Sequence, residues 1–455
     1  MLCCGGEPGL AWRTASLPSM VEFETTRPHS LMANARLSEV LFASTLVCYL
    51  LIAADIVPGV TGLQAEYEPG YLDVVNIDKA GDVIRQALLA PFFLGSVYLL
   101  ARARLKENLR RLGWPAAIVI AICFLSAAWS SDTMATLRKA LGLFGTFSVG
   151  TYVASRLSSH RFAKLVQIAV IVALAGSFMW LLIAPDKALD TNGQLRGLFN
   201  HKNILGQFAG IGYLAFLSLA VRETGRRRLI RLGGAGACVL SLLLASSATP
   251  LIAIGFVTAW AYARSRLGLR PRELVVLTVV ICVGGVLFLV AAPDAFTSIV
   301  GRDVTLSGRT NIWQFALEMA TEKPLLGYGY GVFWLGPNSP GSLFWDKTLQ
   351  FELSAHNGYL QCLLDLGMVG LSATIITVFK PLLRAQTSSG VKRPYIDRPE
   401  NFSEWFLIFF LILNVAEIRF FDPTSVVTFV FAYIGAHQRG RNGGRRVRGG
   451  ASFTD

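Results

Sequence analysis

LSAHNGYLQCLLDLGMVGL, residues 353–371, places two polar side chains, His356 and Asn357, directly before a long apolar run. The run continues to about residue 380, and about 20 mostly apolar residues suffice to cross a bilayer as a helix. The pattern predicts a membrane helix over 357–380 with an imidazole at its mouth. What that imidazole does depends on its neighbours, so the other spans must be located first.

Composition indicates a membrane protein. The chain has 455 residues, of which 53% are hydrophobic and 16% charged, and its mean hydropathy is +0.50. Soluble domains carry about 25% charged residues. The net charge of +13 comes from short basic clusters between apolar runs, which argues against nucleic-acid binding. The seven cysteines show neither metal-ligand nor disulfide spacing, and no metal or cofactor is predicted.

Apolar runs of membrane-spanning length recur along the chain and predict an all-α polytopic fold of about twelve transmembrane helices. They divide it into a disordered N-terminal segment (1–34), one membrane domain (35–438) and a basic tail (439–455). The expected spans are 38–57, 83–101, 113–130, 134–154, 162–184, 202–221, 229–247, 249–264, 273–292, 357–380, 403–419 and 424–438.

Lysine and arginine predict how these spans are oriented. Basic clusters lie near 102–111, 156–164, 222–231, 264–272 and 380–398, and in the tail RGRNGGRRVRGG. With twelve spans, all of them fall on the side of the N-terminus, whereas the first loop on the other side is acidic. By the positive-inside rule, both termini are predicted to be cytoplasmic. The outer side then holds a large loop at 293–356 and a smaller one at 185–200.

Several basic residues run against this charge rule, because they fall on the outer side. A charge within the bilayer costs about 2.5–3.5 kcal/mol, so cations here indicate an anionic ligand, and arginine's planar fork suits phosphate. For each residue, a solvated or interfacial side chain remains the alternative. The candidate ligand-binding residues, with two tyrosines able to stack on sugar, are Arg138, Lys139, Arg196, His201, Lys202, Asn203, Arg302, Arg309, Tyr328, Tyr330, His356 and Asn357.

The segment SGRTNIWQFALEMA (307–320) predicts a helix inside the large loop. Ser307 is a suitable N-cap, and Ile312, Phe315 and Met319 recur at helical spacing. The pattern is typical of an amphipathic helix lying on the membrane surface. Arg309 in its first turn opposes the helix dipole. It is either a surface charge or part of an anion site together with the free N–H groups.

Two further features have open interpretations. PLLGYGYGVFW (324–334) alternates glycine with aromatic residues, which indicates either close backbone approach to a ligand or simple turns. Asp365 lies about 13 Å below His356 along the predicted helix. It is either a functional acid or a side chain that pairs with a neighbouring helix.

His356 is the candidate general base. An ordinary histidine pKa near 6.5 allows the side chain to accept a proton at neutral pH. A purely structural role is the alternative, and Glu352 is the nearest rival.

Three stretches in this order, GLFNHKNILGQFAGI, LSGRTNIWQFALEMATEKPLLGYGYGVFW and SAHNGYLQCLLDLGMVGL, resemble the O-antigen ligase / O-antigen polymerase family, in particular exopolysaccharide polymerases of the ExoQ type. The resemblance implies a fold related to the GT-C glycosyltransferases, in a multi-pass protein of the bacterial inner membrane. It implies a donor glycan carried on undecaprenyl pyrophosphate and transferred on the periplasmic face without metal. It also implies that His356 activates the acceptor hydroxyl and that Arg309 and Arg196 grip pyrophosphate.

The resemblance favours an inverting polymerase that extends lipid-linked repeat units into exopolysaccharide or O-antigen-like polysaccharide. Its expected partners are the lipid-linked oligosaccharide, membrane lipids and other polysaccharide export and chain-length proteins. A ligase that transfers the glycan to lipid A core or protein is the alternative within the family. A small-anion or solute transporter is the alternative outside it, although a transporter's polar residues would lie deeper in the membrane.

Overall fold

The computed structural model describes residues 29–56, 71–103, 105–267, 309–348, 354–387 and 401–449. Contacts divide the chain into Met1–Ser44 and Thr45–Asp455, and the site lies in the second unit. Arg302, Ser307, Glu352 and the expected span 273–292 lie outside the described residues. So do residues 1–28 of the expected N-terminal segment, whereas residues 29–34 already belong to the first helix.

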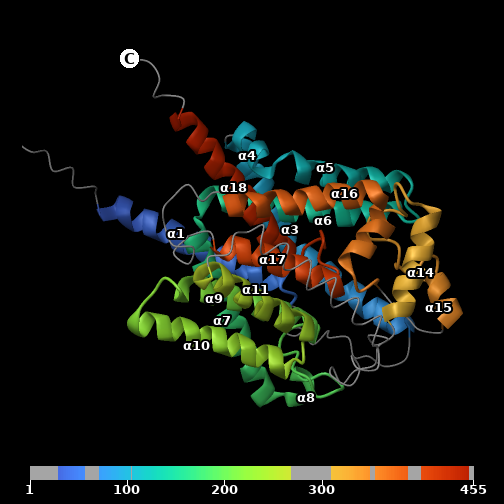
Figure 1. The fold of residues 1–455 in the computed structure, drawn as a ribbon, viewed down its shortest axis with the longest axis horizontal. Helices are drawn as coiled ribbons and strands as arrows, with labels where there is room; N and C mark the ends of the chain where they lie inside the picture. Colours follow the sequence, from blue (N-terminus) through green and yellow to red (C-terminus); the bar gives the residue numbers. More distant parts are fainter. Residues whose placement is uncertain are drawn as a thin grey trace, which may run out of the picture. The chain divides into compact units, whose positions relative to one another are not determined.

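The described residues form helices and loops, and their only β-pairing is a single bridge between Leu189 and Leu195. The predicted all-α class is therefore confirmed. The elements, labelled in Figure 1, are α1 (His29–Ala53), α3 (Tyr71–Arg102), α4 (Leu105–Leu112), α5 (Trp114–Leu125), η1 (Ser126–Ala128), α6 (Thr133–Arg156), α7 (Ser159–Ile183), α8 (Pro185–Ala188), α9 (Lys202–Ala220), α10 (Gly225–Leu244), α11 (Ala248–Arg266), α14 (Arg309–Glu322), α15 (Ser342–Thr348), α16 (Gly358–Thr387), α17 (Asn401–Ala416) and α18 (Val426–Gly449).

Four of the described helical segments are long and apolar enough to cross a membrane: Ile84–Arg102, Ser159–Ile183, Lys202–Ala220 and Gly358–Leu383. A fifth span is possible if α4 and the segment Trp114–Ala128, bent by 82°, count as one. The other expected spans within the described residues are helices as well, but they are shorter, less apolar or more highly charged. The chain is an integral membrane protein by these helices, while the count of twelve and the sidedness stay predictions.

Two groups of helices meet along α17. In one, α6 contacts α3, α5 and α18, and α16 lies beside α5; in the other, α9 contacts α7, α10 and α11. Figure 1 shows α14 and α15 at one end of these helices. Helices α6 and α18 approach closely because Gly150 has no Cβ, and a Cβ there would overlap Ala432 and Tyr433. Small residues allow the same close approach between membrane helices in general.

The end of the helices away from α14 carries the basic clusters, and we call it the basic end. There the Arg264 guanidinium forms a buried ion pair of 2.7 Å with Glu404, so that the last turn of α11 is joined to the first turn of α17. Trp260 donates a hydrogen bond to the same carboxylate. The opposite end, which we call the loop end, comprises residues 184–201, 245–247, 309–348, 354–357 and 417–425.

Helix α16 is broken at Gly367, where φ is 64° and ψ is −166°. The glycine–aromatic segment runs against this break. The N–H of Met368 donates to Pro324 O (2.8 Å), and the N–H of Tyr328 donates to Leu364 O (2.8 Å). A Cβ at Gly367 would overlap the Leu325 carbonyl. The close approach that glycine permits here is therefore to the backbone of α16, which satisfies the polar groups freed by the break.

The predicted helix at Arg309 is present as α14, and its apolar residues Ile312, Phe315 and Met319 are buried as the spacing predicted. The apolar face, expected to lie against the membrane surface, is instead covered by protein. These side chains belong to a core within the large loop, together with Phe333, Trp334, Phe344, Trp345 and Leu364. The apolar face of α14 is covered because α15 and the start of α16 supply enough aromatic surface to bury it.

Candidate functional site

His356 occupies a turn held by hydrogen bonds from distant residues. Its backbone φ is +46°, a left-handed conformation that non-glycine residues adopt at a cost. Trp313 of α14 donates its indole N–H to Ala355 O (3.0 Å), and Ala355 N donates to the Gln361 side chain (3.2 Å). The turn is thus fixed from both sides, and the half-buried imidazole is presented at the loop end.

Asn357 caps the helix that follows. Its side-chain oxygen accepts hydrogen bonds from the backbone N–H groups of Tyr359 (2.9 Å) and Leu360 (3.1 Å) at the start of α16. An asparagine in this position satisfies N–H groups that would otherwise lack a partner. The sequence HN followed by an apolar run therefore builds a sharp helix start directly after the imidazole.

Arg309 lies at the first residue of α14 and is directed at another helix end. Its Nη1 donates to the main-chain oxygen of Ala416 (3.0 Å), the last residue of α17. The negative end of the α17 dipole favours this cation, while the dipole of α14 opposes it. Arg309 is brought beside the segment 417–423, which links α17 to α18.

Arg196 is bonded within its own loop. The guanidinium Nε donates to Lys187 O (3.1 Å), and the side chain is buried. Nearby, Lys202 forms an ion pair with Asp190 (3.1 Å). Although burial raises the pKa of Asp190, the N–H of Gln194 and the Lys202 ammonium lower it more, so the pKa lies below its ordinary value. This loop is a charged turn held by internal hydrogen bonds and an ion pair.

A second histidine lies near the first. His201 caps α9 by accepting a hydrogen bond from Asn203 N at its Nδ1 (3.1 Å). Desolvation lowers the pKa of His201, and the charges of Lys202, Arg419 and His356 lower it further, whereas Asp190 raises it. Contacts bring His201, His356 and Arg419 to the same place. Glu417 joins Arg419 to Asn203, two residues after His201. Asn414 accepts a hydrogen bond from Arg419 N and packs against Gly358, two residues after His356. We call His201, His356 and Arg419 the histidine cluster.

Arg419 is held in place by acidic side chains. Its guanidinium contacts Asp422 (2.6 Å) and Glu417 (4.0 Å). Glu417 also accepts a hydrogen bond from the Asn203 amide (3.1 Å). The backbone N–H of Arg419 donates to the buried Asn414 side chain (2.9 Å). Two distant parts of the chain, around residues 203 and 419, are thereby joined.

These acidic residues and Arg419 were missed by the sequence analysis. A usable signal was present, because EIRFFD (417–422) puts an arginine between two acids in the short loop before the last expected span. Arg419 is a further basic residue on the side where the charge rule expects few. Arg419 was missed because it was assigned as the last residue of the expected span 403–419.

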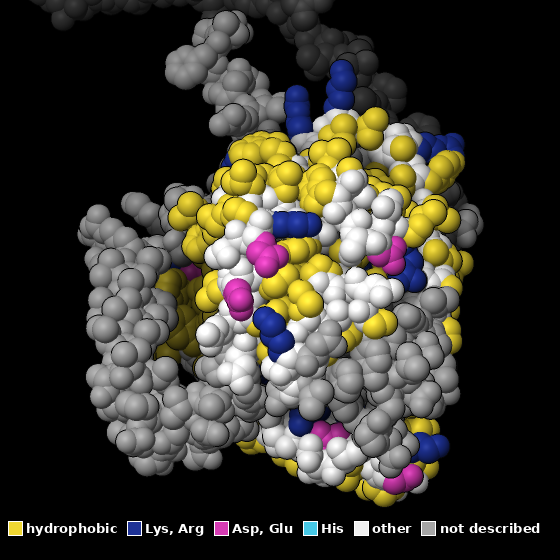
Figure 2. All heavy atoms as spheres, turned by 90° about the vertical axis from the view of Figure 1, so that its right-hand side faces the viewer, with side chains coloured by type: hydrophobic (Ala, Val, Ile, Leu, Met, Phe, Trp, Pro, Cys, Tyr) yellow, Lys and Arg dark blue, Asp and Glu magenta, His cyan; other side chains and the backbone are white. Residues whose placement is uncertain are grey.

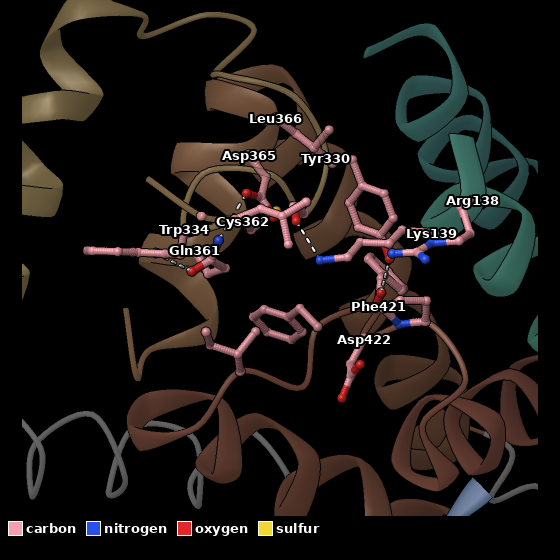
Figure 3. A pocket seen from close by; sticks show the side chains of 16 residues that line it. Arg138, Lys139, Tyr330, Trp334, Gln361, Cys362, Asp365, Leu366, Phe421 and Asp422 are labelled. Atoms are coloured by element: carbon pink, nitrogen blue, oxygen red, sulfur yellow. Dashed lines mark hydrogen bonds between the residues drawn. The ribbon is translucent and has the colours of Figure 1, made fainter. Parts of the chain in front are cut away.

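A cavity of about 290 Å³ lies at the loop end and holds the Arg138–Lys139 pair. In Figure 3, both basic side chains extend from α6 toward residues of α16 and of the loop after α14. Lys139 donates to Gly331 O (2.6 Å), and Gln361 donates to the Asp365 carboxylate (2.9 Å). Asp365 is thus bonded within its own helix and lines this cavity. Asp422 also lines the cavity, so the cavity and the histidine cluster share the segment 417–423.

The two candidate tyrosines have different surroundings. Tyr328 is buried in the loop core, where its hydroxyl donates to Met319 O (3.0 Å) or Glu322 (2.8 Å). Tyr330 forms part of the cavity wall, and its hydroxyl donates to the main-chain oxygen of Phe421. Burial raises the pKa of Tyr330 well above its ordinary value, so this hydroxyl stays protonated. Of the pair, only Tyr330 lines the cavity.

Backbone strain concentrates at the loop end. Among the described residues, the non-glycine positions with positive φ are Asp55, Ser246, His356, Phe421 and Thr424, and four of them lie in the loop-end segments. The fifth, Asp55, accepts a hydrogen bond from Asn200 N (3.2 Å), next to His201. Strained residues persist where the surrounding structure holds them for function. Figure 2 faces this end, where basic and acidic side chains lie among hydrophobic ones.

Comparisons with known proteins show which proteins this helical membrane protein is similar to. Residues 233–375 match the family model described as O-antigen ligase, a range that includes Arg309 and His356 but neither Arg196 nor Arg419. The chain is also similar to the exopolysaccharide production protein ExoQ of Rhizobium meliloti (strain 1021), with 30% identity over 205 residues.

This similarity covers 42% of the chain and 47% of ExoQ, so the chain spans about half the length of that curated relative. Both findings are similarities, and together they support an O-antigen ligase / ExoQ-like family. The resemblance seen in the sequence motifs is confirmed. The roles of individual residues stay predictions.

Proposed function

We propose that this protein is a glycosyltransferase of the inner membrane that polymerises repeat units carried on undecaprenyl pyrophosphate, acting on the periplasmic face. The observation that carries the proposal is the histidine cluster. His356, on a strained and doubly anchored turn, is connected to His201 and Arg419 through the contacts of Asn414 and Glu417. Arg309 is bonded to the residue directly before segment 417–423. A candidate base and cations suited to phosphate thus gather from sequence-distant loops.

The proposed reaction needs a base and a stabilised leaving group. His356 accepts the proton of an acceptor hydroxyl, whose oxygen forms a bond to the anomeric carbon of the donor. The bond between that carbon and the pyrophosphate oxygen breaks, and the pyrophosphate leaves with the electron pair. A positioned base contributes about 10²–10⁴-fold. Arg309 and Arg196 stabilise the charge that develops on the leaving group, and no metal is invoked.

Polymerisation is favoured over ligation by the name of the relative, which is an exopolysaccharide production protein. Ligation is the second candidate, because the matching family is described as O-antigen ligase. The two reactions share the donor and differ in the acceptor. In one it is a fresh lipid-linked repeat unit, and in the other it is lipid A core or a protein.

The test uses full-length protein in liposomes, supplied with a repeat unit linked to undecaprenyl pyrophosphate, and reads product length on a gel. Wild type is expected to form a ladder, and His356→Ala to lose it. His160→Ala, at the basic end, is the matched control and is expected to retain it. Full activity of His356→Ala would refute the assignment of the base.

Acceptor and transport assays decide between the alternatives. If the donor is consumed only after lipid A core or protein is added, the protein is a ligase. If no glycan is transferred with either acceptor, while liposomes take up radiolabelled phosphate, the protein is a transporter. Export and chain-length proteins are omitted first and then added, because they are expected to change product length rather than the chemistry.

A further inference from the structure

The cavity beside α6 has features that the proposed donor site does not use. Its volume of about 290 Å³ lies at the lower limit for small-molecule sites, which suits about one or two sugar rings. Aromatic residues make up much of its wall, namely Tyr330, Trp334, Phe420 and Phe421. An apolar, aromatic wall with a few placed polar groups is the usual construction of a small-molecule site.

Most polar groups of the wall are bonded to one another. Trp334 donates its indole N–H to Gln361 (3.1 Å), and Gln361 donates to Asp365 (2.9 Å). Lys139 donates to Gly331 O (2.6 Å). These bonds set the shape of the cavity, and Figure 3 shows them as dashed lines along its wall.

Arg138 is the exception. Its side chain is exposed and lines the cavity, and no other described residue forms a hydrogen bond or ion pair with it. An arginine offers a planar pair of donors that matches one carboxylate. Among the described lining residues, Asp422 is already paired with Arg419 and Asp365 is bonded to Gln361, which leaves the single fork of Arg138 to bind a charged group of a ligand. One carboxylate on an otherwise neutral ligand matches that fork.

The cavity adjoins the proposed reaction centre through two contacts. Gln361 of the wall accepts the hydrogen bond from Ala355 N, the residue before His356. Asp422 of the wall pairs with Arg419 of the histidine cluster (2.6 Å). A sugar held in the cavity therefore lies beside the turn that presents His356.

We propose that this cavity binds the terminal sugar of the acceptor and that Arg138 recognises a carboxylate on that sugar. That the bound sugar belongs to the acceptor rests on the proposed glycosyl transfer. The binding of an acidic sugar in this cavity does not depend on that proposal. The substrate class is thereby narrowed to glycans whose repeat unit carries an acidic sugar.

The binding test uses the full-length chain in nanodiscs and isothermal titration with cellobiuronic acid, cellobiose and inorganic pyrophosphate. Wild type is expected to bind cellobiuronic acid about 10- to 100-fold more tightly than cellobiose, as a hydrogen bond between charged groups allows. Arg138→Gln is expected to abolish that difference and to leave cellobiose binding unchanged. Arg156→Gln, at the other end of α6, is the matched control and keeps the difference.

Three results would overturn the proposal: equal affinity of wild type for the two disaccharides, no binding of either, or pyrophosphate binding that Arg138→Gln removes. A turnover assay separates this inference from the proposed function. The KM of wild type is expected to be higher for an acceptor whose carboxyl group has been reduced than for the acidic acceptor, with little change in kcat. The KM of Arg138→Gln is expected to be the same for both acceptors. If no glycan is transferred at all but the acidic disaccharide still needs Arg138, the proposed function fails and the acidic-sugar site stands.

Discussion

The guanidinium of Arg309 donates a 3.0 Å hydrogen bond to the main-chain oxygen of Ala416, so the first residue of α14 meets the last residue of α17. The contact offsets the unfavourable dipole of α14 with the favourable one of α17. It also brings the large loop against segment 417–423. Arg309 thus has a structural partner in addition to its proposed ligand.

Replacing Arg309 separates these two roles. Arg309→Ala is expected to lower kcat at least about 100-fold, because removing one preorganised donor typically costs 10²–10³. Arg309→Lys is expected to recover part of the rate, since it keeps the charge but not the fork. Steady-state turnover in liposomes measures both, with the exposed Arg226→Ala at the basic end as control. A lower melting temperature with unchanged kcat would show that Arg309 has only its structural role, the contact to Ala416.

Arg419→Gln is expected to raise the pKa of His201, because the positive charge of Arg419 lowers it in the native structure. Arg419→Lys retains the charge and is expected to change it less. Histidine-selective isotope labelling and NMR titration measure the pKa, and His201→Asn assigns the signal. An identical His201 pKa in all three proteins would show that the two side chains do not interact.

Stability is expected to fall in mildly acidic solution through His201. The folded pKa lies below the ordinary value of about 6.5, so the unfolded state binds the proton more readily. The contribution of His201 is complete above pH 6.5 and is lost as the pH falls through the folded pKa. Protonation also removes the acceptor that caps α9. Thermal unfolding should show wild type losing stability relative to His201→Asn on acidification, and parallel pH curves would contradict this.

Gly367→Ala is expected to destabilise the fold by about 1–3 kcal/mol, because φ is +64° and a Cβ would overlap the Leu325 carbonyl. Gly255→Ala provides the matched control inside α11, where a Cβ meets no atom within 4 Å. That change is expected to be neutral or to stabilise by about 0.5–1 kcal/mol. Thermal or denaturant unfolding in detergent gives both values, and equal stability of the two variants would contradict the break in α16.

Glu404→Ala is expected to cost about 3–5 kcal/mol, because it leaves the buried Arg264 guanidinium without its ion-pair partner. Glu223→Ala breaks the more exposed pair with Arg231 at the same end and is expected to cost about 0–1 kcal/mol. The two variants are compared by unfolding in detergent. Similar losses in both would mean that burial does not distinguish the pairs.

Much of the helical framework was predictable from local pattern. The apolar spacing around Ile312 and Phe315 predicted α14, and HN before an apolar run predicted the start of α16. Both signals are local, because helical periodicity and capping involve residues within a few positions of one another. The break at Gly367 was not predicted, since it depends on backbone hydrogen bonds from residues 324–328, which approach only in the folded chain.

By itself the sequence determined an all-helical membrane protein, a resemblance to the O-antigen ligase / ExoQ-like family and one histidine at a helix mouth, and it predicted an outer set of basic residues. These follow from hydropathy and from motifs, which need no knowledge of long-range contacts. Only the tertiary structure decided which residues lie near one another: His201 and Arg419 with His356, and Arg138 in the adjoining cavity. Such groupings depend on how distant loops pack, because an interaction between charges depends on their distance in space.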